Sequence, residues 1–184
     1  MTPITKAART WAIGFLNLSV LWGGVTVVPL FAQESEHMNH KAPARLVRDV
    51  RNATRQFLDV NNAAPAGYGP SFGCVSGPDH GAMGIHYVNG SLLNGPIDPT
   101  HPQALIYEPQ SNGELKLVGV EFIILASALP PNAAPQVGGH LMLFVDGPNR
   151  YGLPPFFELH VWAWRDNPQG PFVDWNDHVS CAAQ

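Results

Sequence analysis

Three apolar runs of this chain each carry one residue of a type that binds metal ions. These are His86 within residues 83–88, Glu121 within 117–123 and His160 within 157–162. A β-strand places alternate side chains on opposite faces, so a His or Glu flanked by Val, Ile and Phe is expected to point into a sheet interior. An unpaired imidazole or carboxylate is costly there unless it meets a hydrogen-bond partner or a metal ion. Two histidines and a carboxylate from three strands match the ligands of zinc, iron, copper or manganese.

Two further histidines are candidate ligands of the same divalent transition metal. His140 opens another expected strand, and His80 lies six residues before His86. Two His and one carboxylate with open positions would resemble a catalytic site, suited to hydrolytic or oxygen chemistry. The chain could equally be no enzyme, and the site could be metal-free, with a Glu–His pair acting as acid and base. In a purely structural role, His86 would bind a backbone carbonyl and Glu121 would pair with Arg165 or Arg150.

Aromatic residues beside these positions predict a ligand pocket. The four candidates for its lining are Tyr87, Phe122, Trp162 and Trp164. Strand alternation puts Trp162 and Trp164 on one face, with Glu158 and His160. It also predicts one face for Leu115, Leu117, Gly119, Glu121 and Ile123. Glycines at 84 and 119 leave space beside His86 and Glu121, or mark places of close approach.

The elements that must position these residues are one helix and a set of strands. Residues 43–61 predict an amphipathic helix, because Leu46, Val50, Ala53 and Phe57 recur on one face. Strands are expected at residues 83–89, 103–108, 115–125, 140–146 and 156–164. Asn112-Gly113 predicts a hairpin turn between the second and third of these strands. The fold class is therefore α+β, an N-terminal amphipathic helix followed by a mainly antiparallel curved sheet or small β-barrel with a pocket on its concave side.

Basic side chains form a separate stripe on the expected helix, with Lys41, Arg45, Arg48, Arg51 and Arg55 spaced by 3 or 4 residues. The stripe is either a solvated face or a docking surface for an acidic partner in the cell envelope or for lipid. Both interpretations stay open at this point.

The N-terminus has the pattern of an export signal. Lys6 and Arg9 precede an apolar stretch that reaches Ala32, so residues 1–32 are expected to be a signal peptide or an uncleaved membrane anchor. Residues 33–42 form a flexible polar segment, and 43–184 a single domain. Without Lys6 and Arg9, 8 basic side chains remain against 14 acidic ones, a net charge of −6 that argues against nucleic acid as a partner.

Both cysteines, Cys74 and Cys181, lie in the part expected to be exported. An even number of cysteines in an oxidising compartment predicts a disulfide, and no C-x-x-C spacing favours a metal site instead. We expect a periplasmic or secreted protein that meets the membrane only if the N-terminal segment stays uncleaved.

Familiar enzyme motifs such as H-E-x-x-H and the P-loop are absent from the sequence. The H-x-H pattern of cupins is absent too. The stretches 81–89 (GAMGIHYVN), 160–164 (HVWAW) and 174–181 (DWNDHVSC) resemble those of uncharacterised secreted bacterial proteins. The resemblance implies a bacterial exported domain and no particular activity.

The sequence thus predicts an exported metal-binding protein, with a metalloenzyme as one form of it. The alternatives are a metal-free β-barrel that binds a small molecule and an envelope interaction protein. In the first two cases a small ligand or substrate is the expected partner.

Overall fold

The computed structural model describes residues 45–184. The expected export segment (1–32), the polar segment (33–42) and the first two residues of the expected helix lie outside this range. Within it, no helix has both the length and the apolar character needed to cross a membrane.

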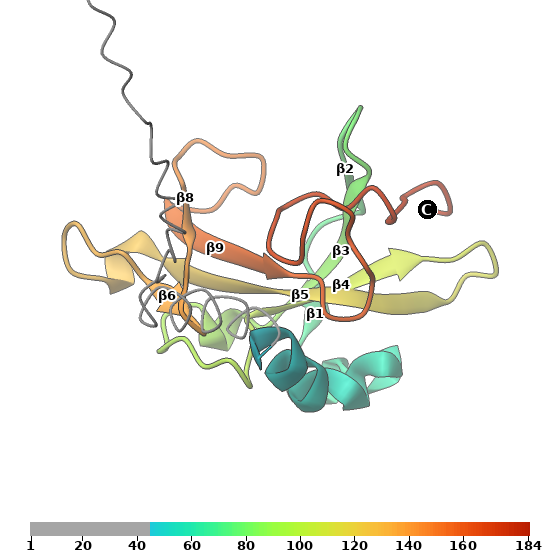
Figure 1. The fold of residues 1–184 in the computed structure, drawn as a ribbon, viewed down its shortest axis with the longest axis horizontal. Helices are drawn as coiled ribbons and strands as arrows, with labels where there is room; N and C mark the ends of the chain where they lie inside the picture. The colour runs from blue at the N-terminus through green and yellow to red at the C-terminus, as the bar shows by residue number, and fades with distance from the viewer. Residues whose placement is uncertain (1–44) are drawn as a thin grey trace, which may run out of the picture.

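A seven-stranded antiparallel sheet forms the centre of the fold (Figure 1). Its strand order is β1-β3-β4-β5-β9-β8, with β2 also paired to β3, and β6 and β7 form a small separate pair. The strands are β1 Gly69–Pro70, β2 Val75–Ser76, β3 Ala82–Val88, β4 Ala104–Pro109, β5 Leu115–Leu125, β6 Gln136–Val137, β7 His140–Leu141, β8 Leu143–Val145 and β9 Phe156–Val161.

The sheet is open, so of the two expected forms, a curved sheet or a small barrel, the barrel was wrong. Strand β8 pairs with β9 and strand β1 with β3, and no pairing joins the two edges among the described residues. The edge strands are only two or three residues long, too short to carry the ladder that closure requires. The α+β description holds in its coarser form, as an antiparallel sheet with a few short helices.

The central strands follow the sequence pattern closely. Strands β3, β4 and β5 lie where apolar runs predicted them, and the β4–β5 hairpin turns at Asn112-Gly113 as expected. The expected strand 140–146 is instead divided at Met142 into β7 and β8. The expected strand 156–164 ends at Val161.

Residues 45–54 form the N-terminal helix, which ends earlier than the sequence predicted. Leu46 and Val50 are buried on its inner side. Beyond it the chain continues as 3₁₀ turns; Asp59 caps one of them, and Pro65 lies in the first turn of another. Between residues 45 and 184 the 3₁₀ helices are η1 Arg55–Leu58, η2 Val60–Asn62, η3 Ala64–Ala66, η4 Gly90–Leu92 and η5 Ala126–Ala128.

The two faces of the sheet are covered differently. The helix packs on one face, where Leu46 and Val50 join Leu105, Tyr107 and other β-residues in the main core. Loops lie over the other face, among them the C-terminal segment drawn in red in Figure 1. Two smaller apolar clusters sit under these loops, one around Trp162 and one around Phe156.

A β-bulge changes which residues of β5 share a face. The register shifts between Ile106 and Tyr107, so that Ile106 pairs with Gly119 and Tyr107 with Leu117. Val118 is the extra residue of the bulge. The expectation that Leu117 and Glu121 share a face is therefore wrong, because Leu117 belongs to the core under the helix.

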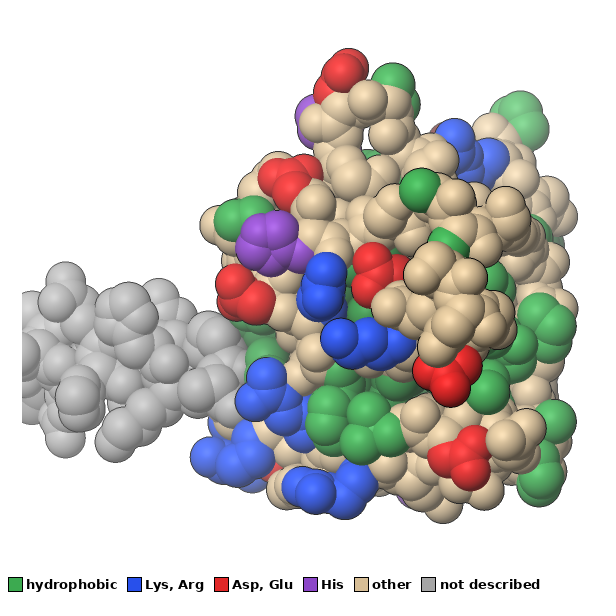
Figure 2. All heavy atoms as spheres, turned by 90° about the vertical axis from the view of Figure 1, so that its right-hand side faces the viewer, with side chains coloured by type: hydrophobic (Ala, Val, Ile, Leu, Met, Phe, Trp, Pro, Cys, Tyr) green, Lys and Arg blue, Asp and Glu red, His purple; other side chains and the backbone are tan. Residues whose placement is uncertain are grey.

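Basic side chains gather toward the lower edge of the face in Figure 2, the side on which Figure 1 places the helix. Part of the basic stripe is engaged within the protein. Arg45 and Arg48 approach Asp49, and Arg51 Nε donates to the carbonyl of Ala163. A partner for this stripe remains a prediction.

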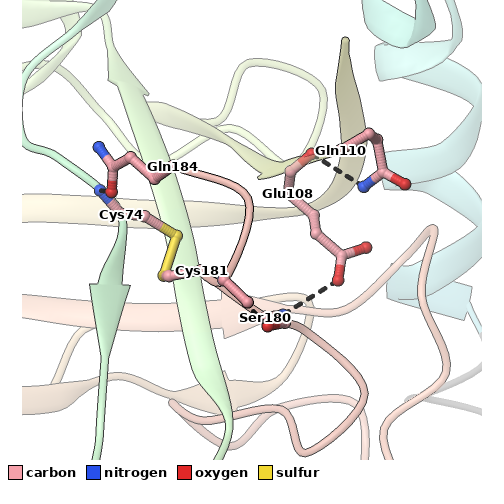
Figure 3. The surroundings of a disulfide bond; sticks show 7 residues. Cys74, Glu108, Gln110, Ser180, Cys181 and Gln184 are labelled. Atoms are coloured by element: carbon pink, nitrogen blue, oxygen red, sulfur yellow. Dashed lines mark hydrogen bonds between the residues drawn. A yellow bond between two sulfur atoms is a disulfide. The ribbon is translucent and has the colours of Figure 1, made fainter. Parts of the chain in front are cut away.

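Cys74 and Cys181 form the expected disulfide. Around it, Cys74 N donates to the Gln184 side chain at 2.7 Å, and Ser180 N donates to Glu108 at 3.0 Å (Figure 3). These contacts hold the C-terminal segment over the face of the sheet opposite the helix.

Candidate metal centre

The three residues singled out by the sequence meet on the loop-covered face of the sheet. His86 comes from β3, Glu121 from β5 and His160 from β9, and they are 3%, 5% and 1% exposed. Each offers one ligand atom such that the three atoms lie within 4.8 Å of one another. Nε2 of His86 is 3.4 Å from Oε2 of Glu121.

Strand register explains how they meet. Glu121 and His160 are directly opposite one another on β5 and β9. His86 must reach across β4, whose residue opposite Glu121 is Ala104. Because the alanine side chain is small, the side chains of β3 and β5 can approach over it.

The two glycines mark close approaches of the surrounding chain. A Cβ on Gly84 would lie 2.7 Å from the carbonyl oxygen of Tyr107, and the φ of +98° also favours glycine there. A Cβ on Gly119 would lie 3.1 Å from the Trp162 ring. That ring stacks on His160, with centroids 5.9 Å apart.

Two further acidic residues complete the surroundings. Glu158 lies two residues before His160 on β9 and is 4% exposed. Asp174 comes from the C-terminal segment, and its Oδ1 is 3.5 Å from Nδ1 of His160. Glu158, His160 and Asp174 form a second group that could hold a metal ion.

Several buried polar atoms of this cluster have no hydrogen-bond partner among the described residues. They include both ring nitrogens of His160, Oε2 of Glu158 and Oδ1 of Asp174. Buried polar groups are nearly always paired in folded proteins. Neither arginine considered as a partner for Glu121 serves that role, since Arg165 donates to the His178 carbonyl and Arg150 lies over Trp175. The cluster could therefore hold a metal ion.

The protonation states follow from burial. Desolvation, with a smaller contribution from His160, lowers the pKa of His86 to about 3, so its ring is neutral near pH 7. Desolvation raises the pKa of Glu121 well above its usual value, and the neighbouring Glu158 and Asp174 raise it further. A neutral imidazole is the form that binds a metal ion, and a bound cation would reverse the effect on the carboxyl group.

A cavity of about 370 Å³ opens onto His86 and Glu121. Its walls are mainly apolar, from Phe72, Val88, Leu93, Ile123, Leu153 and Phe156. Tyr151 also lines it and donates a hydrogen bond to Sδ of Met83 at 3.4 Å. Burial raises the pKa of the Tyr151 hydroxyl, as do the charges of Glu158, Glu121 and Asp174, so this residue stays neutral near the carboxylates.

His80 and His140 lie elsewhere. They line a second cavity, of about 630 Å³, which Asp174 also lines. The structure places neither of them in the group formed by His86, Glu121 and His160. Strand β7 is short and belongs to the small β6–β7 pair, so His140 is not carried by the main sheet.

The four aromatic residues expected in a pocket take other places. Tyr87 and Phe122 pack on the face that carries the helix. Trp162 packs beside the site and donates to the Val173 carbonyl at 2.6 Å. Trp164 turns to the helix side, where its Nε1 donates to Thr54, because β9 has already ended. The expectation of one face for Trp162 and Trp164 was thus wrong.

The sequence carried a signal for one of the additional acidic residues. Glu158 precedes His160 by two positions, and residues so spaced on a strand share a face. Asp174 lies in an irregular segment whose path no local pattern predicts.

Comparison with family models, with curated proteins and with solved structures gave no match for the chain.

Proposed function

We propose that this chain is an exported metal-binding protein, with a divalent transition metal ion bound by His86, Glu121 and His160. The observation that carries the proposal is the convergence of buried polar atoms that lack partners, above all the two ring nitrogens of His160. Mixed imidazole and carboxylate ligands suit zinc, iron, manganese or copper.

The cavity supports a role that goes beyond structural metal binding. It ends at His86 and Glu121, so a bound ion would face it rather than be enclosed by protein ligands. Such an ion would supply Lewis acidity and lower the pKa of a bound water. We propose a small molecule with an apolar body and a polar end as the ligand or substrate, since the walls are apolar and the polar groups lie at one end.

Residues of the chain would divide the remaining tasks. Phe72 and Phe156 line the cavity and would hold the apolar body of the ligand and exclude water. Tyr151 packs against both rings, with centroids 5.4 and 6.1 Å away, and so keeps them in place. The neutral hydroxyl of Tyr151 would exchange its hydrogen bond to Sδ of Met83 for one to the polar end of the ligand. Trp162 would fix the plane of the His160 ring by stacking on it.

Export is supported by the Cys74–Cys181 disulfide, because such bonds persist mainly in oxidising compartments. We therefore propose a periplasmic or secreted location.

The apolar cavity also favours a second candidate function, a metal-free module that binds a small apolar ligand.

Elemental analysis of the protein, purified through a tag that contains no histidine, tests the proposal. We expect at least one equivalent of a transition metal in the wild type and none in the His86→Ala/His160→Ala double variant. His101→Ala is the matched control, because His101 is exposed and bonded to Asp98, and it should keep its metal. A wild type that binds no zinc, copper, iron or manganese after dialysis would reject the proposal and leave the metal-free module.

A further inference from the structure

The candidate metal centre contains two ligand groups that share one residue. His86, Glu121 and His160 form the first group, and Glu158, His160 and Asp174 the second. Within each group the ligand atoms lie within 4.8 Å of one another. His160 therefore belongs to both groups, and Nδ1 of its ring is 3.5 Å from Oδ1 of Asp174.

The second group has the features of a site in its own right. Oε2 of Glu158 and both nitrogens of His160 have no hydrogen-bond partner among the described residues, although these side chains are only 4% and 1% exposed. Burial of such atoms without a partner is costly, and more so when the group is charged. One ion bound by the first group would satisfy one nitrogen of His160 and leave Glu158 as it is.

Charge also favours more than one cation. Three carboxylates, those of Glu121, Glu158 and Asp174, meet at this place. Among residues 45–184, no Lys or Arg forms an ion pair with any of them. When all three are ionised and His160 has given up its ring proton, one divalent cation leaves a net negative charge among groups that are mostly removed from water, and a second divalent cation neutralises it.

Each group has its own access from outside. The first cavity reaches His86 and Glu121, and the second, larger cavity reaches Asp174. A second ion could thus enter from the side of Asp174 without passing through the ligand cavity.

We infer that the protein binds two divalent transition metal ions that share His160, the second held by Glu158 and Asp174. The inference rests on the proposed function, because it adds a second ion to the same centre. Binding through both nitrogens requires that the imidazole give up its ring proton to solvent. Two ions on opposite nitrogens of one ring lie farther apart than the roughly 3.5–4 Å of two-metal hydrolytic sites, so the second ion would hold and polarise the His160 ring rather than share a substrate with the first.

Metal stoichiometry of the full chain, after equilibrium dialysis against zinc chloride or manganese chloride, tests this inference. We expect two equivalents in the wild type and one in Asp174→Asn or Glu158→Gln. We expect one also in His86→Ala, because the second group stays intact. Asp177→Asn is the matched control, since Asp177 is an exposed carboxylate of the same segment, and it should keep two.

The outcomes separate the two proposals. One equivalent in the wild type and still one in Asp174→Asn would overturn the second ion while the first group stands. One equivalent in the wild type, weakened by every variant, would mean that all five residues bind a single ion, which also overturns the inference. A wild type that binds no ion would reject the metal centre altogether. The unfolding temperature of each variant in EDTA shows whether lost binding reflects lost folding.

Discussion

Replacing Glu121 by Gln should stabilise the metal-free protein and weaken the metal-loaded one. The side chain keeps its shape in this substitution but cannot ionise. Burial, Glu158 and Asp174 all raise the pKa of Glu121 above its ordinary value of 4.5. In the folded protein this carboxyl group therefore keeps its proton to a higher pH than it does in the unfolded chain.

The sign and size of the effect follow from this difference. A group whose pKa is raised by folding contributes stability that is fully present below its unfolded pKa and is lost as the pH rises toward its folded pKa. The Gln variant has no such loss. In EDTA its advantage should grow from pH 4.5 upward by as much as about 1.4 kcal/mol per pH unit. For a domain of about 140 residues this corresponds to roughly 4–7 °C of unfolding temperature per pH unit.

Metal should reverse the order of the two proteins. A free metal concentration of 100 times the dissociation constant stabilises the wild type by about 2.7 kcal/mol. The amide of the Glu121→Gln variant is a poorer ligand than the carboxylate, so the same metal concentration stabilises that variant less. Calorimetry from pH 4.5 to 7.5 in EDTA, and at pH 7.5 with zinc, measures both effects. The lowered pKa of His86 affects the two proteins alike, so their difference isolates residue 121.

Glu114→Gln is the control for this experiment. Glu114 is exposed in the β4–β5 turn, and only its backbone is hydrogen-bonded there, to the Asn112 side chain and the Gln110 backbone, so the change should have little effect at any pH. A constant difference between Glu121→Gln and the wild type across the pH range in EDTA would refute the reasoning. So would an equal response of the two proteins to zinc.

Two further predictions concern the scaffold. Replacing Cys74 and Cys181 by Ser opens a covalent link across 107 positions and should cost about 3–5 kcal/mol in urea unfolding; an unchanged midpoint would show that the C-terminal segment is held by its other contacts. Gly84→Ala should cost about 2–4 kcal/mol, because its Cβ would press on the Tyr107 carbonyl at a positive φ. Gly113→Ala has a similar φ of +82° in open space and should cost about 1 kcal/mol, so equal losses at 84 and 113 would contradict the packing argument.

Much of the site could be predicted because strand alternation is a local rule. His86, Glu121 and His160 each interrupt an apolar run, and the pattern alone indicates that they point inward. What brings them together is long-range. The pairing of Glu121 with His160, and the small Ala104 between Glu121 and β3, depend on strand order, which the sequence does not reveal.

The failures have equally physical causes. The bulge at Ile106 moves Leu117 to the other face, and no composition signal marked it. Trp164 leaves the face of Trp162 because β9 ends at Val161. A barrel was expected from the number of strands, but closure depends on edge strands that here are two or three residues long. Asp174 is placed by the C-terminal segment, whose course is determined by the disulfide and by contacts far along the chain.

X-ray diffraction from crystals of the metal-loaded protein, collected at the absorption edge of the bound metal, tests the central claim most directly. We expect an anomalous difference peak about 2.0–2.2 Å from ligand atoms of His86, Glu121 and His160. Protein that carries metal but shows its peak elsewhere, for example between His80 and His140 in the second cavity, would contradict the account.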